Sequence, residues 1–483
     1  MSTLAKEIGR GTSSIFLAEA LALPAGLLLA RLLSIALGPA GYGRYGVAAS
    51  IVLAAEWLIV AAYSRISVQL LSEAQSRESL EPSVVRHYFF SALGVMALFI
   101  LFADTLSKAL HAPSLAADLR WLSLDLPLFA LAQAQRTILT ARHEYSGRAF
   151  AIIIRWVCRV AGTWGLLAMG FGIRAGLWAW PLASVAELVC LRRLPLRSIF
   201  DKRKTSLSIW REGWAPFLFS AGQRALERID LLVLQALGTA APAVGMYVAA
   251  QNLSILPGIF AASLTPVLTA TMTRERVLGR EQASRRSAAM SLKAAIYLLP
   301  LAAIFGFCGA DVSQLAFGAK FRAAGPLTGW LIAAYIGLAL ASTAASIISS
   351  QGRHRLTAYL SIPAAVFALI LQPLIIPKFG MEGAAIVSAL IGLTSGLAGV
   401  TMLYRLWNQK FPWAMLLRAA GATLAVLALG RLQPIAALVL PVRFTCLSLV
   451  SGITLIAAGD WQLLQFNARF LRIGRILESR KAG

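Results

Sequence analysis

The stretch LALPAGLLLARLLSIALGPAGYGRYGVAAS, Leu21–Ser50, sets the class of this protein. Its first 17 residues are apolar except for Arg31 and Ser34, and a run rich in glycine and tyrosine follows before the chain becomes apolar again. About 20 apolar residues are enough to cross a lipid bilayer. The stretch therefore predicts one membrane span, a tight turn and the start of a second span, with a fixed positive charge inside the first.

The same pattern recurs along all 483 residues, of which 58% are hydrophobic and only 14% are charged. In soluble domains about a quarter of the residues are charged. Hydropathy predicts fourteen apolar helices with short connections, so an all-α polytopic membrane protein is expected; twelve spans stay open if two weak ones pair up. No large domain lies outside the bilayer, so the function is expected in or across the membrane.

Positive charge is distributed unevenly between alternate loops. Roughly 27 lysines and arginines fall on the side of the N-terminus and roughly eight on the other side, so the positive-inside rule places both termini in the cytoplasm. An even number of spans fits this orientation. The net charge of +24 belongs to these loops, and no nucleic-acid partner is expected.

An internal repeat divides the chain. ALGPAGYGRYGVAAS at 36–50 returns as ALGTAAPAVGMYVAAQ at 236–251, and a second pair of similar segments has nearly the same offset. Two six-helix units in the same orientation build a central site between two halves. The predicted organisation is an N-terminal lobe at 1–195, a basic cytoplasmic linker at 196–212, a C-terminal lobe at 213–408, two further spans at 409–458 and an amphipathic cytoplasmic tail at 459–483.

Several spans carry basic residues, each costing about 2.5–3.5 kcal/mol at the bilayer centre, so buried charges indicate function. Arg155 and Arg159 are four residues apart, share a helix face and have no acid near them on that helix. Arg31 either lines a cavity or extends toward the interface, and Arg136 lies near a helix end, where an interfacial position is expected. The candidate cavity cations are Arg31, Arg155, Arg159, Arg224, Arg228 and Lys293.

Acidic residues inside the spans are candidates for ion pairs or for coupling to a Na⁺ or H⁺ gradient or to the membrane potential. Glu227 and Asp230 are expected to neutralise neighbouring arginines in part. The surplus charge stays cationic. This suits a phosphate-bearing substrate, because one guanidinium group can donate two parallel hydrogen bonds to phosphate oxygens. The acidic candidates are Glu56, Asp125, Glu187, Glu227 and Asp230.

No catalytic site emerges from the sequence. The four histidines have no ligand partner at helical spacing, the four cysteines lie in apolar segments, and no phosphate-binding loop follows a strand. A non-enzyme without metal or cofactor is expected.

Four segments, in order over roughly residues 20–405, resemble the polysaccharide flippases of the MOP superfamily. RLLSIALGPAGYGRYGVAAS is similar to their first-span signature, and RIDLLVLQALGTAAPAVGMYVAAQNL, LAFGAKFRAAGPLTGWLIAAY and IIPKFGMEGAAIVSAL resemble later spans. The second turn departs from the pattern because Pro242 is displaced. The residues that match the motif are Arg31, Gly38, Pro39, Tyr42, Gly43 and Tyr45, and in the second half Asp230, Gly245 and Tyr247.

The resemblance implies a V-shaped pair of six-helix lobes around a central cavity that opens alternately to either side. The implied substrate is an undecaprenyl-diphosphate-linked oligosaccharide, an O-antigen unit of lipopolysaccharide or an exopolysaccharide repeat unit. It would move from the cytoplasmic to the periplasmic leaflet of the bacterial inner membrane. Implied partners are this polyprenyl-diphosphate-linked glycan, membrane lipids, and a glycan polymerase or glycosyltransferases; the protein itself is expected to be a monomer.

Three alternatives stay open. A MATE-type multidrug or cation antiporter of the same superfamily needs an acidic cavity, whereas these spans carry more arginine than acid. A lipid II flippase fits fourteen spans equally well. A membrane glycosyltransferase, glycan polymerase or ligase predicts a long periplasmic loop with acidic or histidine catalysts, whereas the longest hydrophilic loop here is basic and on the cytoplasmic side.

Overall fold

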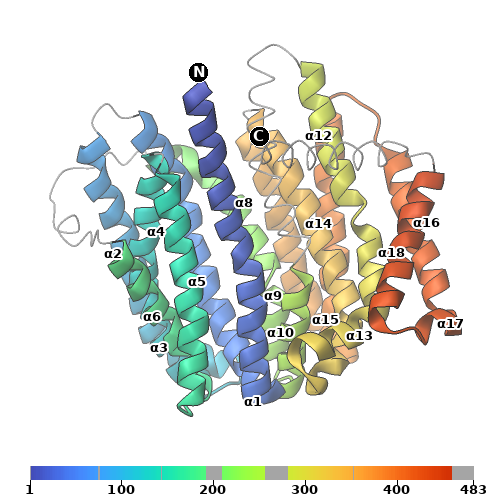
Figure 1. Ribbon diagram of the computed structural model, residues 1–483, viewed down its shortest axis with the longest axis horizontal. Coiled ribbons are helices and arrows are strands. Elements are labelled where there is room, and N and C mark those ends of the chain that lie inside the picture. Colours follow the sequence, from blue (N-terminus) through green and yellow to red (C-terminus); the bar gives the residue numbers. More distant parts are fainter. Residues whose placement is uncertain are drawn as a thin grey trace, which may run out of the picture.

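The computed structural model describes residues 2–73, 77–142, 144–191, 209–255, 281–351 and 353–458, and all regular structure in these ranges is helical (Figure 1). The first half contains α1 (Ser2–Glu73), α2 (Arg77–Ala109), α3 (Leu115–Ser123), α4 (Asp125–Ala141), α5 (Tyr145–Ala168) and α6 (Ile173–Cys190). The second half contains α8 (Ile209–Leu226), α9 (Ile229–Ala236), α10 (Ala241–Ser254), α12 (Glu281–Ile296), α13 (Leu299–Phe317), η1 (Ala319–Ala324), α14 (Gly325–Ser350), η2 (His354–Thr357) and α15 (Ala358–Leu406). The chain continues with α16 (Trp413–Gly430), α17 (Gln433–Ala436) and α18 (Leu440–Ala457).

These elements form fourteen transmembrane arms, as predicted, rather than twelve. Two long elements each contain two arms, because α1 turns at Gly38 (φ 63°) and α15 turns at Gly380 (φ 57°). Three other spans are each interrupted: α3 continues into α4, α8 into α9, and α12 into α13. Hydropathy did not predict these breaks. Eight segments of the described chain are long and apolar enough to cross a membrane, and two of the eight are these double arms.

The turns at one end of the molecule show the internal repeat in the backbone. We call this end, where α1 turns at Gly38, the hairpin end. Positive φ angles occur at Gly38, His111 and Gly172 in the first half and at Gly238, Gly318 and Gly380 in the second, with offsets of 200, 207 and 208 residues. Such angles favour glycine because it has no Cβ. Each half therefore makes the same three turns at corresponding positions.

The displaced proline of the second turn is accommodated without disturbing this pattern. Gly238 makes the turn, and Pro242 lies in the first turn of α10. Proline is favoured there because the first amide groups of a helix have no helical partner.

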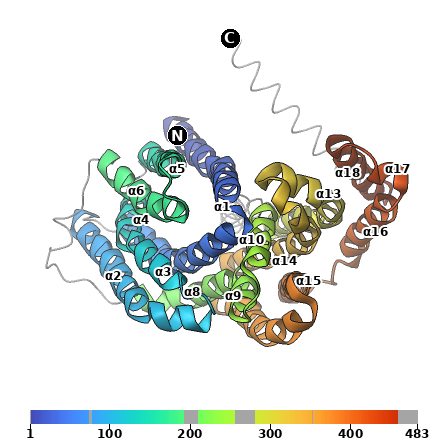
Figure 2. The same cartoon turned by 90° about the horizontal axis from the view of Figure 1, so that it is seen from below.

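Seen from below, the first six spans lie on one side and the next six on the other, with α1 and α10 in contact between them (Figure 2). α16 and α18 lie at the outer edge of the second lobe. They pack on α13, where Val426 and Leu447 join Ile304 and Cys308 in one apolar cluster. The predicted linker at 196–212 lies outside the described residues except for the start of α8, and the predicted tail at 459–483 lies outside them entirely.

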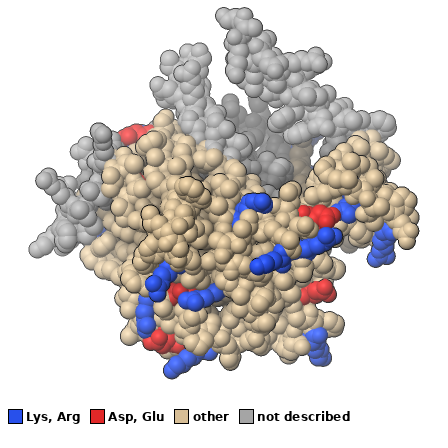
Figure 3. Space-filling view, turned by 60° about the horizontal axis from the view of Figure 1, so that its bottom comes forward, with Lys and Arg blue, Asp and Glu red and all other residues tan. Residues whose placement is uncertain are grey.

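The outer surface has the apolar character of a protein surrounded by lipid. Large apolar side chains such as Leu101, Trp164 and Leu417 are 64–71% exposed. Figure 3, in which the hairpin end comes forward, shows basic and acidic side chains gathered toward that end beside a broad area of uncharged residues. Ion pairs there include Arg120 with Asp104, at 2.6 Å. An exposed apolar surface of this extent marks a membrane-facing belt.

Candidate functional site

The two copies of the repeated turn meet at the boundary between the lobes. A Cβ atom added to Gly43 would lie 2.6 Å from the backbone nitrogen of Gly245, and one added to Gly245 would lie 1.8 Å from the carbonyl oxygen of Pro39. Real Cβ atoms do not approach so closely. The second arm of α1 and the start of α10 therefore pack backbone against backbone, and only glycine at these two positions permits it.

The tyrosines of the repeated turns form hydrogen bonds around this contact. The Asn252 amide of the second lobe donates to the Tyr42 hydroxyl at 2.8 Å. Tyr42 also packs against Phe317 and Phe321, with ring centroids 6.1 and 5.7 Å away. The motif residues Pro39, Tyr42, Gly43 and Gly245 thus belong to one contact between the lobes, and Gly38 makes the turn that precedes it.

Arg31 lies at the same contact. Its guanidinium donates to the carbonyl oxygens of Leu315 and Ala316, and the Ser34 hydroxyl donates to that of Phe317 at 3.1 Å. These are the last carbonyl groups of α13, which have no partner within the helix, and a helix C-terminus favours a cation. The sequence left open whether Arg31 lines a cavity or extends to the interface; the structure places it on the end of a helix in the opposite lobe.

A third set of contacts joins the lobes between other turns. The His111 ring donates to the carbonyl of Ala236 at 2.8 Å, and the Gln235 amide donates to the carbonyl of Leu110 at 3.0 Å. Together with the glycine contact and the α13 cap, these bonds close the hairpin end in this conformation.

A second group of functional side chains surrounds Arg155 within the first lobe. Arg155 on α5 donates to the Ser184 hydroxyl on α6 at 2.7 Å. Ser184 donates to Asp125 on α4 at 2.5 Å, and Arg155 itself reaches the other oxygen of Asp125 at 3.4 Å. Three helices are therefore connected by one buried network, in which Asp125 and Ser184 are fully enclosed.

Two further carboxyl groups face the same guanidinium. Glu56 of α1 and Glu187 of α6 each lie 3.7 Å from Arg155 nitrogens, and Glu187 also lies 3.5 Å from Nε of Arg136, a side chain only 11% exposed. Its place near a helix end suggested a position at the membrane interface. The structure instead places Arg136 in this buried cluster. The cluster contains three carboxyl groups and two guanidinium groups, so the charge of Arg155 is compensated within the lobe.

Arg159, one turn further along α5, has different surroundings. Its guanidinium carbon lies 3.7 Å from the centre of the Trp180 ring and 5.4 Å from that of Trp156. Its Nε is buried without a hydrogen-bond partner, and no ion pair joins it to a carboxylate in the described part of the chain. The Trp180 indole donates to the Tyr45 hydroxyl at 3.1 Å. The two arginines thus share a helix face, but of the two only Arg155 forms ion pairs with carboxylates in the described residues.

In the second lobe, Asp230 is the centre of a network without basic hydrogen-bond partners. It accepts hydrogen bonds from the Tyr247 hydroxyl at 2.6 Å, from Ser388 at 2.8 Å and from Gln251 at 2.9 Å. The backbone amide of Leu231 adds a fourth bond at 2.8 Å. Asp230 was expected to neutralise neighbouring arginines in part. Its hydrogen-bond partners are neutral groups, and Arg228 interacts with it through space rather than by a hydrogen bond.

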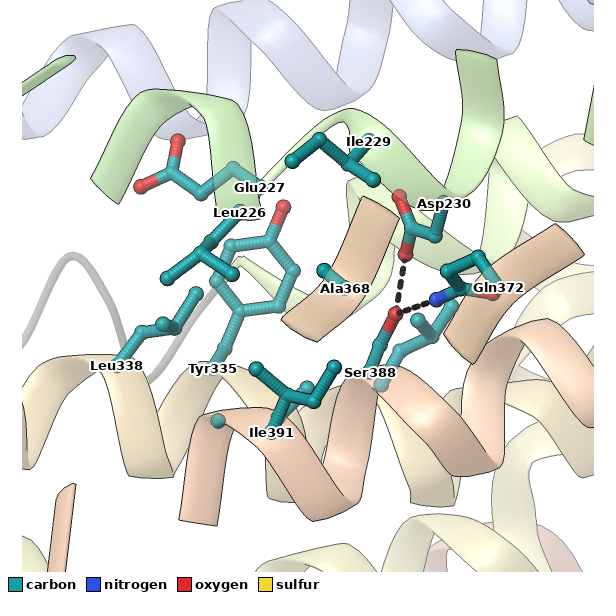
Figure 4. Close-up of a pocket in the computed structure, with 13 residues that line it drawn as sticks. Leu226, Glu227, Ile229, Asp230, Tyr335, Leu338, Ala368, Gln372, Ser388 and Ile391 are labelled. Atoms are coloured by element: carbon teal, nitrogen blue, oxygen red, sulfur yellow. Dashed lines mark hydrogen bonds between the residues drawn. The ribbon is translucent and has the colours of Figure 1, made fainter. Parts of the chain in front are cut away.

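Asp230 borders a small pocket, shown in Figure 4. Asp230, Ser388 and Gln372 point toward one another at one side, and Tyr335 approaches Glu227 at the other. The cavity volume is about 20 Å³. A space of that size holds about one water molecule, so the pocket in this form accommodates no organic substrate.

The remaining predicted cations are distributed over the second lobe. Arg224 donates to Glu227 at 2.7 Å and lies 4.4 Å from the Trp57 ring of the first lobe. Arg228, at the break between α8 and α9, donates to Gln251 at 3.1 Å. Lys293 lies on α12, 5.6 Å from the Tyr297 ring. Of these three only Arg224 and Arg228 are close in sequence, and the six predicted cations do not form a single cluster.

Sequence reasoning missed Ser34, Ser184 and Asn252. Each acts on a residue from a distant part of the chain, and serine and asparagine in an apolar helix carry no spacing signal. The only indication in the sequence came from their partners. A charged or motif residue inside a span needs a polar neighbour, but the sequence does not show which residue supplies it.

The architecture and the closed hairpin end define a two-lobed, multi-pass membrane protein of the transporter type. A family model described as polysaccharide biosynthesis protein matches residues 8–274, more than half of the chain. The chain therefore belongs to this family, and the predicted resemblance is confirmed. No curated protein matches it in sequence.

Solved structures with the same fold come from the MOP superfamily. The lipid II flippase MurJ in an inward closed conformation is 17% identical and has a TM-score of 0.69, covering 94% of this chain and 99% of that one. An inward-facing multidrug resistance MATE family transporter is 12% identical, with a TM-score of 0.66 over 80% of this chain and 94% of that one. A MOP superfamily transporter from Pyrococcus furiosus is 13% identical, with a TM-score of 0.60 over 83% and 96%. The predicted fold class is confirmed.

Replacing Arg155 by alanine should destabilise the protein strongly. The substitution leaves three buried carboxyl groups facing a single arginine, and breaking a buried ion pair by removing one partner costs about 3–5 kcal/mol. Thermal unfolding of the purified protein in detergent, followed by tryptophan fluorescence, measures the loss. Arg159→Ala on the same helix face is the control, since it removes a cation–π contact worth roughly 0.5–2 kcal/mol. Equal losses in the two variants would contradict the assignment of the carboxyl groups to Arg155.

Replacing Gly43 by alanine should open the hairpin end. The new methyl group would overlap the backbone of Gly245, so the lobes must separate there. Val248, buried against Gly46 at the lobe boundary, is replaced by cysteine as a probe in a variant lacking Cys158, Cys190, Cys308 and Cys446. Its rate of reaction with N-ethylmaleimide should rise in Gly43→Ala.

Gly94→Ala provides the control for this experiment, because a Cβ at Gly94 meets no atom within 4 Å. Arg31→Gln, which removes the cap of α13, should raise the labelling rate in the same direction as Gly43→Ala. Unchanged labelling in both Gly43→Ala and Arg31→Gln would show that the two residues do not hold this end closed.

Proposed function

We propose that the protein is a flippase that moves an undecaprenyl-diphosphate-linked oligosaccharide from the cytoplasmic to the periplasmic leaflet of the bacterial inner membrane. The cargo is an O-antigen or exopolysaccharide repeat unit. The single observation that carries the proposal is the contact of the two repeated turns, which closes one end of the protein in a chain belonging to the polysaccharide biosynthesis family. The role is transport and not catalysis.

Alternating access requires an end that closes tightly and also separates. The hairpin end fits this requirement because its bonds between lobes are few: a glycine contact, the α13 cap and single hydrogen bonds from Asn252, His111 and Gln235. None of these interlobe bonds is an ion pair between side chains. The charges buried most deeply, around Arg155, lie within one lobe and can move with it as a unit.

The charge distribution favours an anionic cargo over an organic cation. The buried carboxyl groups of the first lobe face Arg155 and Arg136, and Asp230 accepts four hydrogen bonds from neutral groups. The first-lobe cluster has only one carboxyl group more than it has guanidinium groups, whereas a multidrug antiporter needs an acidic cavity. A diphosphate needs guanidinium groups with unused donors, and Arg159 and Arg228 form no ion pair with a carboxylate in the described chain. A lipid II flippase stays an alternative with the same charge requirement.

Orientation and energy coupling complete the proposal. The excess of lysine and arginine in the loops on the side of the termini supports cytoplasmic termini, so the hairpin end faces the periplasm. Glu56, Asp125 and Glu187 are the coupling candidates in the first lobe, and an H⁺ gradient, a Na⁺ gradient or the membrane potential is the candidate energy source. A polymerase or glycosyltransferases of the same pathway are proposed partners, and the working unit is a monomer.

Deleting the gene should abolish a surface polysaccharide and leave its lipid-linked repeat unit on the cytoplasmic side. Surface glycan is measured by gel electrophoresis of cell extracts. The lipid-linked pool is measured by extraction and mass spectrometry from sealed spheroplasts, with and without an added glycosidase. Plasmid-borne wild-type protein is the control and should restore the glycan. Lysis of the deletion strain with normal surface glycan would favour lipid II, and normal glycan with normal growth would refute both flippase roles.

A further inference from the structure

Arg159 lies within the membrane-spanning part of the first lobe. It is nine residues from the hairpin-side end of α5, and Trp180 is seven residues from the corresponding end of α6. At 1.5 Å per residue these positions are about 14 and 10 Å inside. A fixed cation at such depth is costly and indicates a functional site. In the described chain no carboxylate forms an ion pair with it, and the nearby Glu56, which faces Arg155, acts on it only at longer range.

The contact with Trp180 leaves the hydrogen-bonding groups of Arg159 unused. A guanidinium carbon 3.7 Å from the ring centre lies over the face of the indole. The five N–H groups of a guanidinium are hydrogen-bond donors, and the contact of the guanidinium carbon with the ring supplies an acceptor to none of them. Nε is already buried without an acceptor. The side chain is therefore fixed in position while its donors stay available.

The tryptophan beneath Arg159 is itself held in place. Trp180 is only 2% exposed, and its indole N–H donates to the Tyr45 hydroxyl at 3.1 Å. Tyr45 stacks against Tyr42, with ring centroids 6.5 Å apart, and Tyr42 accepts the hydrogen bond from Asn252 of the other lobe. The motif tyrosine of the first turn thus orients the indole that orients the arginine.

We infer that Arg159 binds a phosphate oxyanion of a diphosphate group, with Trp180 and Tyr45 as positioning residues that fix its guanidinium. The inference rests on the proposed function and specifies where that substrate's diphosphate is held. Phosphate oxygens supply acceptors in the spacing that a guanidinium fork matches, which a lysine ammonium does not. Arg155, four residues earlier, is excluded from this role because carboxylates already surround it.

Binding measurements on the purified full-length protein in detergent test the inference. Isothermal titration with farnesyl diphosphate should give binding that falls roughly tenfold to a hundredfold in Arg159→Gln, as expected for losing hydrogen bonds to a charged group. Arg159→Lys should also lose most of the affinity, because it keeps the charge but not the planar fork. Arg174→Gln is the matched control: it removes the same charge from an exposed position at the start of α6 and should bind normally.

Variants of Trp180 and Tyr45 test whether these residues act by positioning the guanidinium of Arg159. Tyr45→Phe removes the acceptor of the indole N–H and should weaken binding less than Arg159→Gln, while Trp180→Ala should weaken it about as much. Adding Tyr45→Phe or Trp180→Ala to Arg159→Gln should cause little further loss of binding, which a purely structural role would not produce. Thermal unfolding identifies any variant that has lost its fold, and Trp180→Phe, which keeps an aromatic face, should recover most of the binding.

Two comparisons separate the possible outcomes. Inorganic pyrophosphate, titrated in parallel, distinguishes a site for a free anion from one that requires the lipid chain; loss of binding of either probe in Arg159→Gln supports the site. Unchanged binding of both probes in Arg159→Gln and Arg159→Lys would overturn it. If the deletion strain still lacks its glycan in that case, the flippase function stands and only this site fails.

Discussion

The backbone contact between Gly43 and Gly245 is the constraint on which the arrangement of the two lobes depends. Both glycines come from the same position of the repeated turn, so the contact lies on the pseudo-symmetry axis and each lobe presents the same surface to the other. The tyrosine hydrogen bond and the helix cap at α13 extend from this point. Any side chain at either glycine would displace all of them together, because each depends on the helices approaching to backbone distance.

The structure separates two arginines that the sequence could only place on the same helix face. Arg155 is enclosed by acids from α1, α4 and α6 and stabilises the first lobe, whereas Arg159 is held by an aromatic ring and keeps its donors free. The ion pairs occupy the donors of Arg155, whereas no hydrogen bond or ion pair occupies those of Arg159 in the described residues. On the proposal made above, one lobe then contains both a fixed internal charge network and the site for an anion.

The span count, the hairpin at Gly38 and the two-lobed repeat were predictable because hydropathy, glycine and an even span parity are local or periodic signals. The partners of the buried charges were not. The acids around Arg155 come from three helices, and the acceptors of Arg31 are backbone carbonyls, which every residue possesses. The helix breaks at Leu124, Arg228 and Tyr297 were also missed, because the hydropathy and helical periodicity of the sequence do not change across them.

The pairing of equivalent glycines also has a consequence for how such a chain arose. Each half has six spans, so a half made as a separate chain would enter the membrane in the same direction as its copy. Two identical halves could then form the same glycine contact about a true twofold axis. Duplication and fusion of one ancestral gene would need no change of membrane orientation, and the two copies could afterwards diverge, one acquiring the charged network and the other the neutral one around Asp230.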